Sequence, residues 1–232
     1  MRTQALIVTA SLVALTAAGC DRTPQASDPL PLTTAAYEPL APAPSVEALP
    51  RATPARLAYL ADPNDAYGYY DQAYDMGWAF ADAPPDYAFD YDGVEPWVWE
   101  TDDGWARYIE PLGYGDRYYY YGPDGGYPFL VRDPDYAYAY DRGGRLVVVY
   151  DRDGRVMPRD FVVERADVAG RYLARAESLR KAARRERREA IAEANWAVRQ
   201  GRIAAERERQ ARLAEQQAAW RSEEHTSELQ SH

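Results

Sequence analysis

The chain is poor in the residues that most often carry catalysis and metal binding. It has one cysteine, Cys20, and two histidines, His225 and His232, which both fall within the last twelve of its 232 residues. A single cysteine excludes a disulfide within the chain. Because no histidine occurs before residue 225, that long stretch has no Ser-His-Asp triad, no Cys-His pair and no histidine ligand for zinc. Only carboxylate chemistry is left, so we predict that the protein is not an enzyme and has no cofactor.

Lysine is nearly absent, and charge is unevenly spread along the chain. All of the 27 basic residues except Lys181 are arginine. Residues 1–162 carry 12 basic and 25 acidic side chains, whereas residues 163–220 carry 14 basic and 9 acidic ones. Residues 221–232 add one Arg and three Glu, so the net charge of −10 combines an acidic N-terminal part with a basic segment at residues 163–220. The sequence has no compact basic patch combined with a known nucleic-acid-recognition motif, so we expect no nucleic-acid partner.

The first residues, MRTQALIVTASLVALTAAGCD, have the layout of an export signal. Arg2 precedes an apolar run of about 14 residues, which is shorter than the roughly 20 needed to span a bilayer. The run ends in LTAAGC, residues 15–20, which resembles the lipobox of bacterial lipoproteins. The resemblance implies that residues 1–19 are a signal peptide and that Cys20 receives the lipid.

In that family the cysteine sulfur is diacylated, and the amine freed by signal peptidase II is usually acylated as well. Each buried CH₂ contributes ~0.8 kcal/mol, so two or three acyl chains attach a protein almost permanently. The resemblance thus implies a membrane partner reached through Cys20 and a domain facing the periplasm. Asp21 is similar to the inner-membrane retention signal of enteric lipoproteins, a rule that other Gram-negative cells need not share, so inner and outer membrane both stay open. The alternative is an ordinary signal peptide with an incidental cysteine.

Residues 20–58 are rich in proline and alanine, with eight prolines between residues 21 and 58. Proline fixes φ and removes a hydrogen-bond donor, so we expect an extended spacer between the lipid and the folded domain. Its reach would lie between ~35 Å as a random coil and ~115 Å when fully extended.

Residues 59–162 hold 18 Tyr, 4 Trp and 4 Phe. Tyrosine has an apolar ring with a polar tip, which suits half-buried strand faces. Residues 69–80 would form one short helix or only loops. Turn sequences such as PDGG, DPD and DRGG separate strand-like runs, and this spacing predicts an antiparallel meander. The runs are 97–100, 105–110, 117–121, 127–132, 136–140, 145–150 and the shorter 155–157.

Residues 163–220 lack proline and are rich in Ala, Arg, Glu, Gln and Leu, which predicts a long basic helix with Asp167 as its N-cap. The apolar stripe is thin, so a coiled coil and a charged single helix both stay open. We expect the helix to bind a protein partner or a second copy of the chain. The first part of the stripe has 4-4-3-4 spacing and comprises Val168, Tyr172, Ala176, Leu179 and Ala183. Beyond it the apolar side shifts gradually around the helix and comprises Ala190, Ile191, Ala194, Trp196, Val198, Ile203 and Leu213.

A basic run on this predicted helix includes Arg184, Arg185, Arg187 and Arg188. In an exported protein these arginines could contact anionic lipid headgroups, lipopolysaccharide or the acidic face of a partner. A solvated helix face is the plainer interpretation.

Three tryptophans flank the predicted hairpin turn at residues 102–104. Trp97 and Trp99 are two positions apart, so they share one face of a strand, and Trp105 follows the turn. Such rings could form an aromatic platform on which a sugar stacks, beside the carboxylates of the turn. The alternative is a hairpin anchored by its tryptophans, whose acidic residues only make the turn.

Two other patterns carry no function. The Asp-rich turns at 90–93 and 151–154 match calcium-binding loops only in part, because neither has an acidic residue at the first ligand position, so we predict no metal site. Segments 140–146 and 150–155 resemble the YD repeats of wall-associated Rhs-type proteins. That family needs many repeats to build its shell, so no function is carried over.

The last twelve residues, RSEEHTSELQSH, differ in composition from everything before them. They closely resemble the translated read-through of a widely used sequencing adapter. We interpret residues 221–232 as an artefact and leave both histidines out of functional reasoning.

These patterns predict an α+β fold: a small antiparallel β-meander domain at residues 59–162, followed by a long, partly amphipathic α-helix at 163–220. They favour a non-catalytic, lipid-anchored protein of the cell envelope with a structural or adaptor role. The rival hypothesis is an envelope glycan-binding module that uses Trp97, Trp99 and Trp105.

Overall fold

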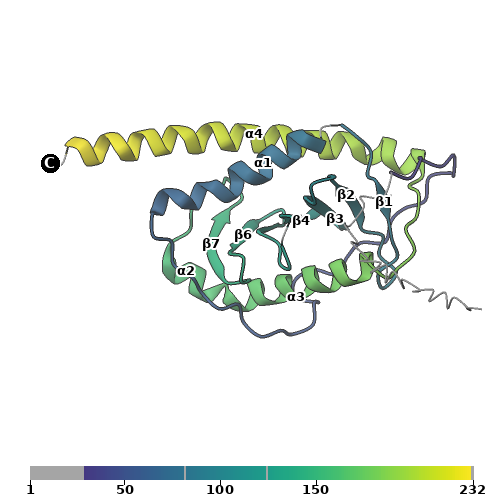
Figure 1. Ribbon diagram of the computed structural model, residues 1–232, viewed down its shortest axis with the longest axis horizontal. Helices are drawn as coiled ribbons and strands as arrows, with labels where there is room; N and C mark the ends of the chain where they lie inside the picture. Colours follow the sequence, from purple (N-terminus) through teal and green to yellow (C-terminus); the bar gives the residue numbers. More distant parts are fainter. Residues whose placement is uncertain (1–28, 81, 124, 231–232) are drawn as a thin grey trace, which may run out of the picture.

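The centre of the protein is a seven-stranded antiparallel sheet whose strands follow one another in chain order (Figure 1). The structure, a computed structural model, describes residues 29–80, 82–123 and 125–230, and of residues 221–230 only the backbone. The sheet confirms the predicted meander and the α+β fold. Its strands are β1 (Tyr87–Ala88), β2 (Trp97–Glu100), β3 (Ala106–Leu112), β4 (Gly115–Tyr121), β5 (Leu130–Arg132), β6 (Tyr136–Tyr140) and β7 (Leu146–Asp151).

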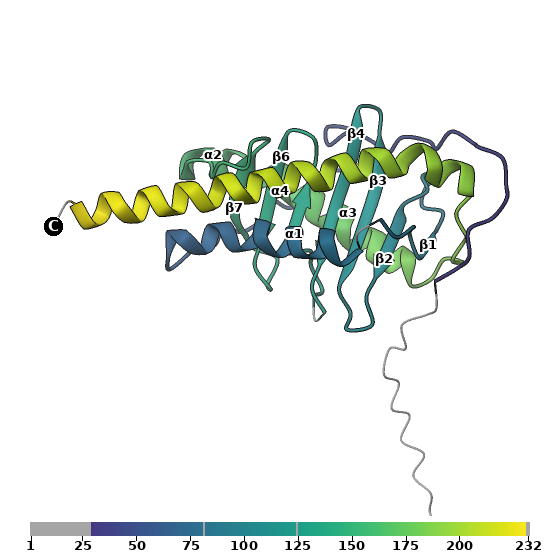
Figure 2. The ribbon, with the colours of Figure 1, turned by 90° about the horizontal axis from the view of Figure 1, so that it is seen from above.

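Helices cover both faces of the sheet (Figures 1 and 2). On one face lie α1 (Gly68–Phe80), which follows the 3-10 helix η1 (Pro63–Tyr67), and α4 (Glu193–Gln230). On the other face lie α2 (Arg159–Glu164) and α3 (Ala166–Ala183). Of the two alternatives for residues 69–80, the structure has the helix.

The consecutive tyrosines of β4 show how the sequence fills two cores at once. Successive side chains of a strand point to opposite faces. Tyr118 and Tyr120 therefore pack beneath α1 and α4, whereas Tyr119 and Tyr121 pack beneath α3. All four are at most 4% exposed, so the tyrosine-rich composition serves a sheet that is buried on both sides.

The single helix predicted for residues 163–220 is divided into α2, α3 and α4. α3 runs toward the β1 end of the sheet, residues 184–192 pass that edge, and α4 returns along the opposite face (Figure 1). This division buries both faces of the sheet, which one straight helix could not do. Asp167 is not the N-cap: it lies in the first turn of α3, whose cap position is Arg165 without a side-chain hydrogen bond.

The spacer prediction is wrong for residues 29–58, which pack on the domain. The backbone N–H of Leu30 donates to the carbonyl of Asp86 at 2.9 Å, and that of Ala58 donates to the carbonyl of Leu146 at 2.9 Å. Leu49 is buried in the core beneath α3. Prolines lack donors, but the residues between them supply enough donors and apolar area to dock the segment. Residues 20–28 of the predicted spacer, like the predicted signal peptide, lie outside the described residues.

Both edges of the sheet are paired by other segments. At the first edge, Ala88 of β1 and Glu189 exchange two backbone hydrogen bonds of 2.8 Å. At the second edge, Leu146 of β7 bridges to Leu57, and Tyr150 bridges to Val156. The strand predicted at 155–157 is therefore only an isolated bridge.

The two YD segments form the same kind of turn. Asp141 Oδ1 accepts from the backbone N–H groups of Gly143 and Arg145 at 2.9 Å, and Asp151 Oδ1 accepts from those of Asp153 and Arg155 at 2.9 Å. Aspartate that accepts from backbone N–H groups two residues on is a general device of tight turns. The likeness to YD repeats follows from this turn chemistry.

Candidate functional site

Trp97 and Trp99 share one face of β2 as predicted, but that face is the interior. They are 0% and 1% exposed, and both rings pack against Trp196 of α4 with centroids 6.2 and 6.5 Å away. The guanidinium carbons of Arg199 and Arg107 lie 4.0 Å from the Trp97 centroid and 4.3 Å from the Trp99 centroid. A sugar cannot stack on rings covered in this way, so the platform hypothesis is wrong for these two residues.

The indole N–H groups of the two buried rings have acceptors within the fold. Trp97 Nε1 donates to Glu95 Oε1 and Trp99 Nε1 donates to the Ala83 carbonyl, both at 3.0 Å. Burial raises the pKa of Glu95, and the hydrogen bond from Trp97 acts in the opposite direction. Trp97 and Trp99 therefore anchor the hairpin in the core, which was the alternative to the sugar-binding platform.

Trp105 is the member of the trio that keeps a solvent-facing side. Its ring packs edge-on against Phe129 at 6.1 Å between centroids, and it lines a shallow groove between α1 and the β2–β3 turn. Asp103 lines the same groove but belongs to the turn, where Thr101 donates to its carboxylate. Trp105 packs against the core cluster that contains Trp97 and Trp99, but those two rings are buried, so the three rings form no common exposed surface.

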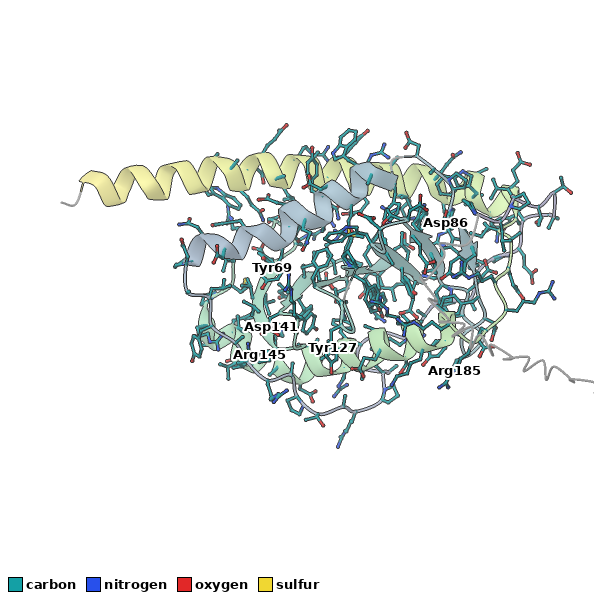
Figure 3. The ribbon with its side chains drawn as sticks, viewed as in Figure 1. Tyr69, Asp86, Tyr127, Asp141, Arg145 and Arg185 are labelled. Carbon is teal, nitrogen blue, oxygen red and sulfur yellow. The ribbon has the colours of Figure 1, made fainter. Side chains whose placement is uncertain are left out.

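The predicted basic run lies in the connection between α3 and α4, not on a helix. Arg184, Arg185 and Arg187 are exposed. Figure 3 places Arg185 at the same end of the molecule as Asp86, which precedes β1. These three arginines remain available for contact with an anionic surface.

Arg188 is held by the domain. Its guanidinium pairs with Glu100 of β2 at 3.3 Å and lies 3.9 Å from the ring centroid of Tyr87. The Tyr87 hydroxyl donates to the same Glu100 carboxylate at 2.8 Å. Arg188 therefore fastens the α3–α4 connection to the edge of the sheet and is not part of a free basic surface.

The stripe by which α4 docks on the sheet is half polar. Its apolar members are Trp196, Ile203 and Leu213, which were on the predicted stripe. The same side of the helix carries four buried polar residues and the partly buried Glu206, and each has a partner outside the helix. The pairs are Asn195 with the Glu38 backbone, Arg199 with Asp116, Glu206 with Arg132, Gln210 with the Tyr120 hydroxyl, and Gln217 with the Gly154 carbonyl.

These polar contacts fix the position of α4 along its axis. Gln210 Nε2 donates to Tyr120 Oη at 2.8 Å, and Gln217 Nε2 donates to the Gly154 carbonyl at 2.7 Å. Moving the helix by one turn would leave these groups buried without partners, which costs about 1–3 kcal/mol for each. Hydrophobic spacing could not reveal this stripe, because it counts only apolar residues, and Val198, a predicted member, is in fact exposed.

The comparisons with known proteins leave the class of the protein open. No family model, no curated protein and no solved structure matches this chain. Among the described residues, no helix is long and apolar enough to cross a membrane, and no group of three or more His, Cys, Asp and Glu side chains could hold a metal ion. Cys20, the predicted lipidation site, lies outside the described residues.

Proposed function

We propose that the protein is a non-catalytic, lipid-anchored protein of the cell envelope with a structural or adaptor role. In this proposal Cys20 carries the lipid, the sheet is a rigid body, and the outward face of α4 engages a protein partner or a second copy. One observation carries the proposal: residues 29–30 join the domain at one edge of the sheet, and the docked part of α4 reaches the other edge.

Leu30 is hydrogen-bonded to Asp86, just before β1, whereas α4 crosses the sheet as far as the turn after β7, where Gln217 donates to the Gly154 carbonyl (Figure 1). Neighbouring strands are about 4.8 Å apart, so six spacings separate the two edges by roughly 29 Å. The polar docking stripe holds α4 in one register over that distance. This arrangement suits a protein that connects a membrane to something beyond it.

The docking of residues 29–58 also limits how far the domain would stand from the lipid. Ten residue steps join Cys20 to Leu30, which allow at most about 35 Å. The domain would thus stay close to the bilayer, where exposed Arg184, Arg185 and Arg187 could meet anionic headgroups.

The anchor is tested by expressing the full chain and a Cys20→Ser variant in a Gram-negative host fed with labelled palmitate. We expect label and sedimentation with membranes for the parent, and neither for the variant. A parent chain that carries no label, or a labelled Cys20→Ser variant, would contradict the lipid anchor.

The adaptor role is tested by placing a photo-crosslinking amino acid at Arg212 of α4, which is exposed, and as a control at Arg142 in the exposed β6–β7 turn. We expect a defined adduct in intact cells from Arg212 and none from Arg142. An adduct of twice the chain mass would identify a second copy as the partner. If Arg212 gives no adduct, or both positions give the same ones, α4 is not the engaging surface.

A further inference from the structure

Four arginines border a cavity between α4 and the strand turns. The cavity has a volume of about 470 Å³ and lies beside the β3–β4 turn, the β5–β6 turn and the residue after β7. This size is within the usual range for small-molecule sites. Its charged lining includes Arg132, Arg152, Arg202 and Arg209, with Asp116 and Glu206 among the carboxylates.

The carboxylates of this lining are already engaged. Glu206 pairs with Arg132 at 2.5 Å and with Arg209 at 3.0 Å, and Asp116 pairs with Arg199 at 2.7 Å. Asp133, the third acid on the wall, accepts from the Tyr172 hydroxyl and from two backbone N–H groups of its own turn.

Two arginines of the lining have no acidic partner among the described residues. Arg152 and Arg202 are both exposed, and within the described residues no carboxylate lies at ion-pair distance from either guanidinium. Two atoms of the lining residues, Arg132 Nε and Asp116 Oδ2, are among the buried polar atoms that have no hydrogen-bond partner in the described part of the chain. The cavity thus presents an excess of positive charge at its open side.

We propose that this cavity binds a phosphate group, with Arg152 and Arg202 as the residues that hold it. A guanidinium presents a planar fork of donors that fits two oxygens of a phosphate, and charge-assisted bonds of this kind are the strong ones. The source is either a free phosphate compound or the phosphodiester of a lipid headgroup. Neither Arg212 nor Arg142, the positions probed for the adaptor role, lines this cavity.

The test measures thermal unfolding of the full chain, purified in a neutral detergent, as sodium phosphate is added. Sodium acetate and sodium chloride at equal ionic strength are the reference salts. Arg152→Gln and Arg202→Gln remove the two holding residues, and Arg212→Gln is the matched control, exposed on the same helix and outside the cavity.

We expect a saturable rise of the unfolding temperature with phosphate, absent with acetate, in the parent chain and in Arg212→Gln. The apparent Kd should rise about tenfold or more in each of the other two variants, because each loses a charge-assisted contact. The proposal is overturned if phosphate acts no differently from acetate, or if all three variants bind phosphate equally.

Soluble dihexanoylphosphatidylglycerol distinguishes the two sources. Stabilisation by both this lipid and inorganic phosphate, lost together in Arg202→Gln, would identify the headgroup. Stabilisation by phosphate alone would identify a free phosphate compound. A response to the lipid alone that survives in both Arg152→Gln and Arg202→Gln would place lipid binding elsewhere and overturn the proposal.

Discussion

Glu110 of β3 and Arg175 of α3 form a buried ion pair that joins the sheet to the helix. Glu110 Oε1 accepts from Arg175 Nη2 at 2.5 Å and from Nε at 3.0 Å, and Glu110 is 0% exposed. Its other oxygen accepts from the Tyr119 hydroxyl at 2.6 Å. The carboxylate is therefore fully enclosed by donors from two layers of the fold.

Replacing Arg175 with Met should destabilise the protein by about 3–5 kcal/mol, because it removes a main cationic partner of a buried carboxylate. Denaturant unfolding measures this loss. The control is Asp167→Asn on the same helix, which breaks the more exposed pair between Asp167 and Arg171 and should cost at most about 1 kcal/mol. Equal losses in the two variants would mean that burial of the Glu110 pair is not what makes it matter.

Gly170→Ala should disturb the docking of residues 29–58. A Cβ at Gly170 of α3 would collide with the carbonyl of Thr53 and come within 3.1 Å of the backbone nitrogen of Ala55. We expect a loss of about 1–3 kcal/mol and faster amide exchange in residues 50–58, measured by mass spectrometry.

Gly201→Ala on α4 is the matched control, since nothing lies within 4 Å of its Cβ position. It should stabilise the protein by about 0.5–1 kcal/mol through helix propensity alone. If Gly170→Ala were also stabilising, residues 53–55 would not lie against α3.

Trp97→Ala should cost about 3–5 kcal/mol, because it opens a cavity between β2 and α4. Trp105→Ala should cost clearly less, since that ring is only partly covered. Denaturant unfolding of the two variants compares them directly. A glycan platform requires the opposite order, with Trp97 dispensable for stability.

Alkaline pH should unfold the protein through its buried tyrosines. Burial raises the pKa of Tyr70 to about 12, and it also raises the pKa of Tyr119, Tyr121 and Tyr150 well above the usual value of a tyrosine. The unfolded chain releases these protons near pH 10, whereas the folded chain keeps them. Stability is therefore intact below about pH 10 and falls as the pH rises, by about 1.4 kcal/mol per unit of pKa shift for each tyrosine.

Tyrosinate absorbance and near-ultraviolet circular dichroism, followed together, check this prediction. We expect most tyrosines to ionise in one steep step that coincides with loss of the dichroism. Tyr70→Phe keeps the ring and removes one such phenol, so it should move the step to higher pH. Gradual ionisation with unchanged dichroism would show that the tyrosines are accessible in the folded state.

Local patterns were enough to predict the meander and the buried side of α3. The turn sequences placed β6 and β7 to within one residue, because the Asp141 and Asp151 turns are made by residues within four positions of each other. The run predicted at 127–132 is a strand only at Leu130–Arg132. The 4-4-3-4 spacing identified Tyr172, Ala176, Leu179 and Ala183, all buried beneath the sheet.

Features that depend on distant partners were not predictable in this way. The spacing of Trp97 and Trp99 correctly predicted that they share one face of a strand. It could not show that this face is buried, because the ring that covers it, Trp196, is on α4, about 100 residues later in the chain. β1 was missed because two residues carry no periodicity, and it exists through pairing with β2 and with Glu189. The polar contacts of α4 likewise join residues that are far apart in sequence.

The pairing of Ala88 with Glu189, and of Leu146 and Tyr150 with Leu57 and Val156, has a consequence for crowding. Proteins concentrated on a two-dimensional surface meet one another often, and an unpaired strand edge is then a template for runaway polymerisation. Here other segments of the chain pair with backbone groups at both margins. A second molecule that met these paired stretches would find side chains to recognise, and a single substitution can adjust the affinity of such a contact.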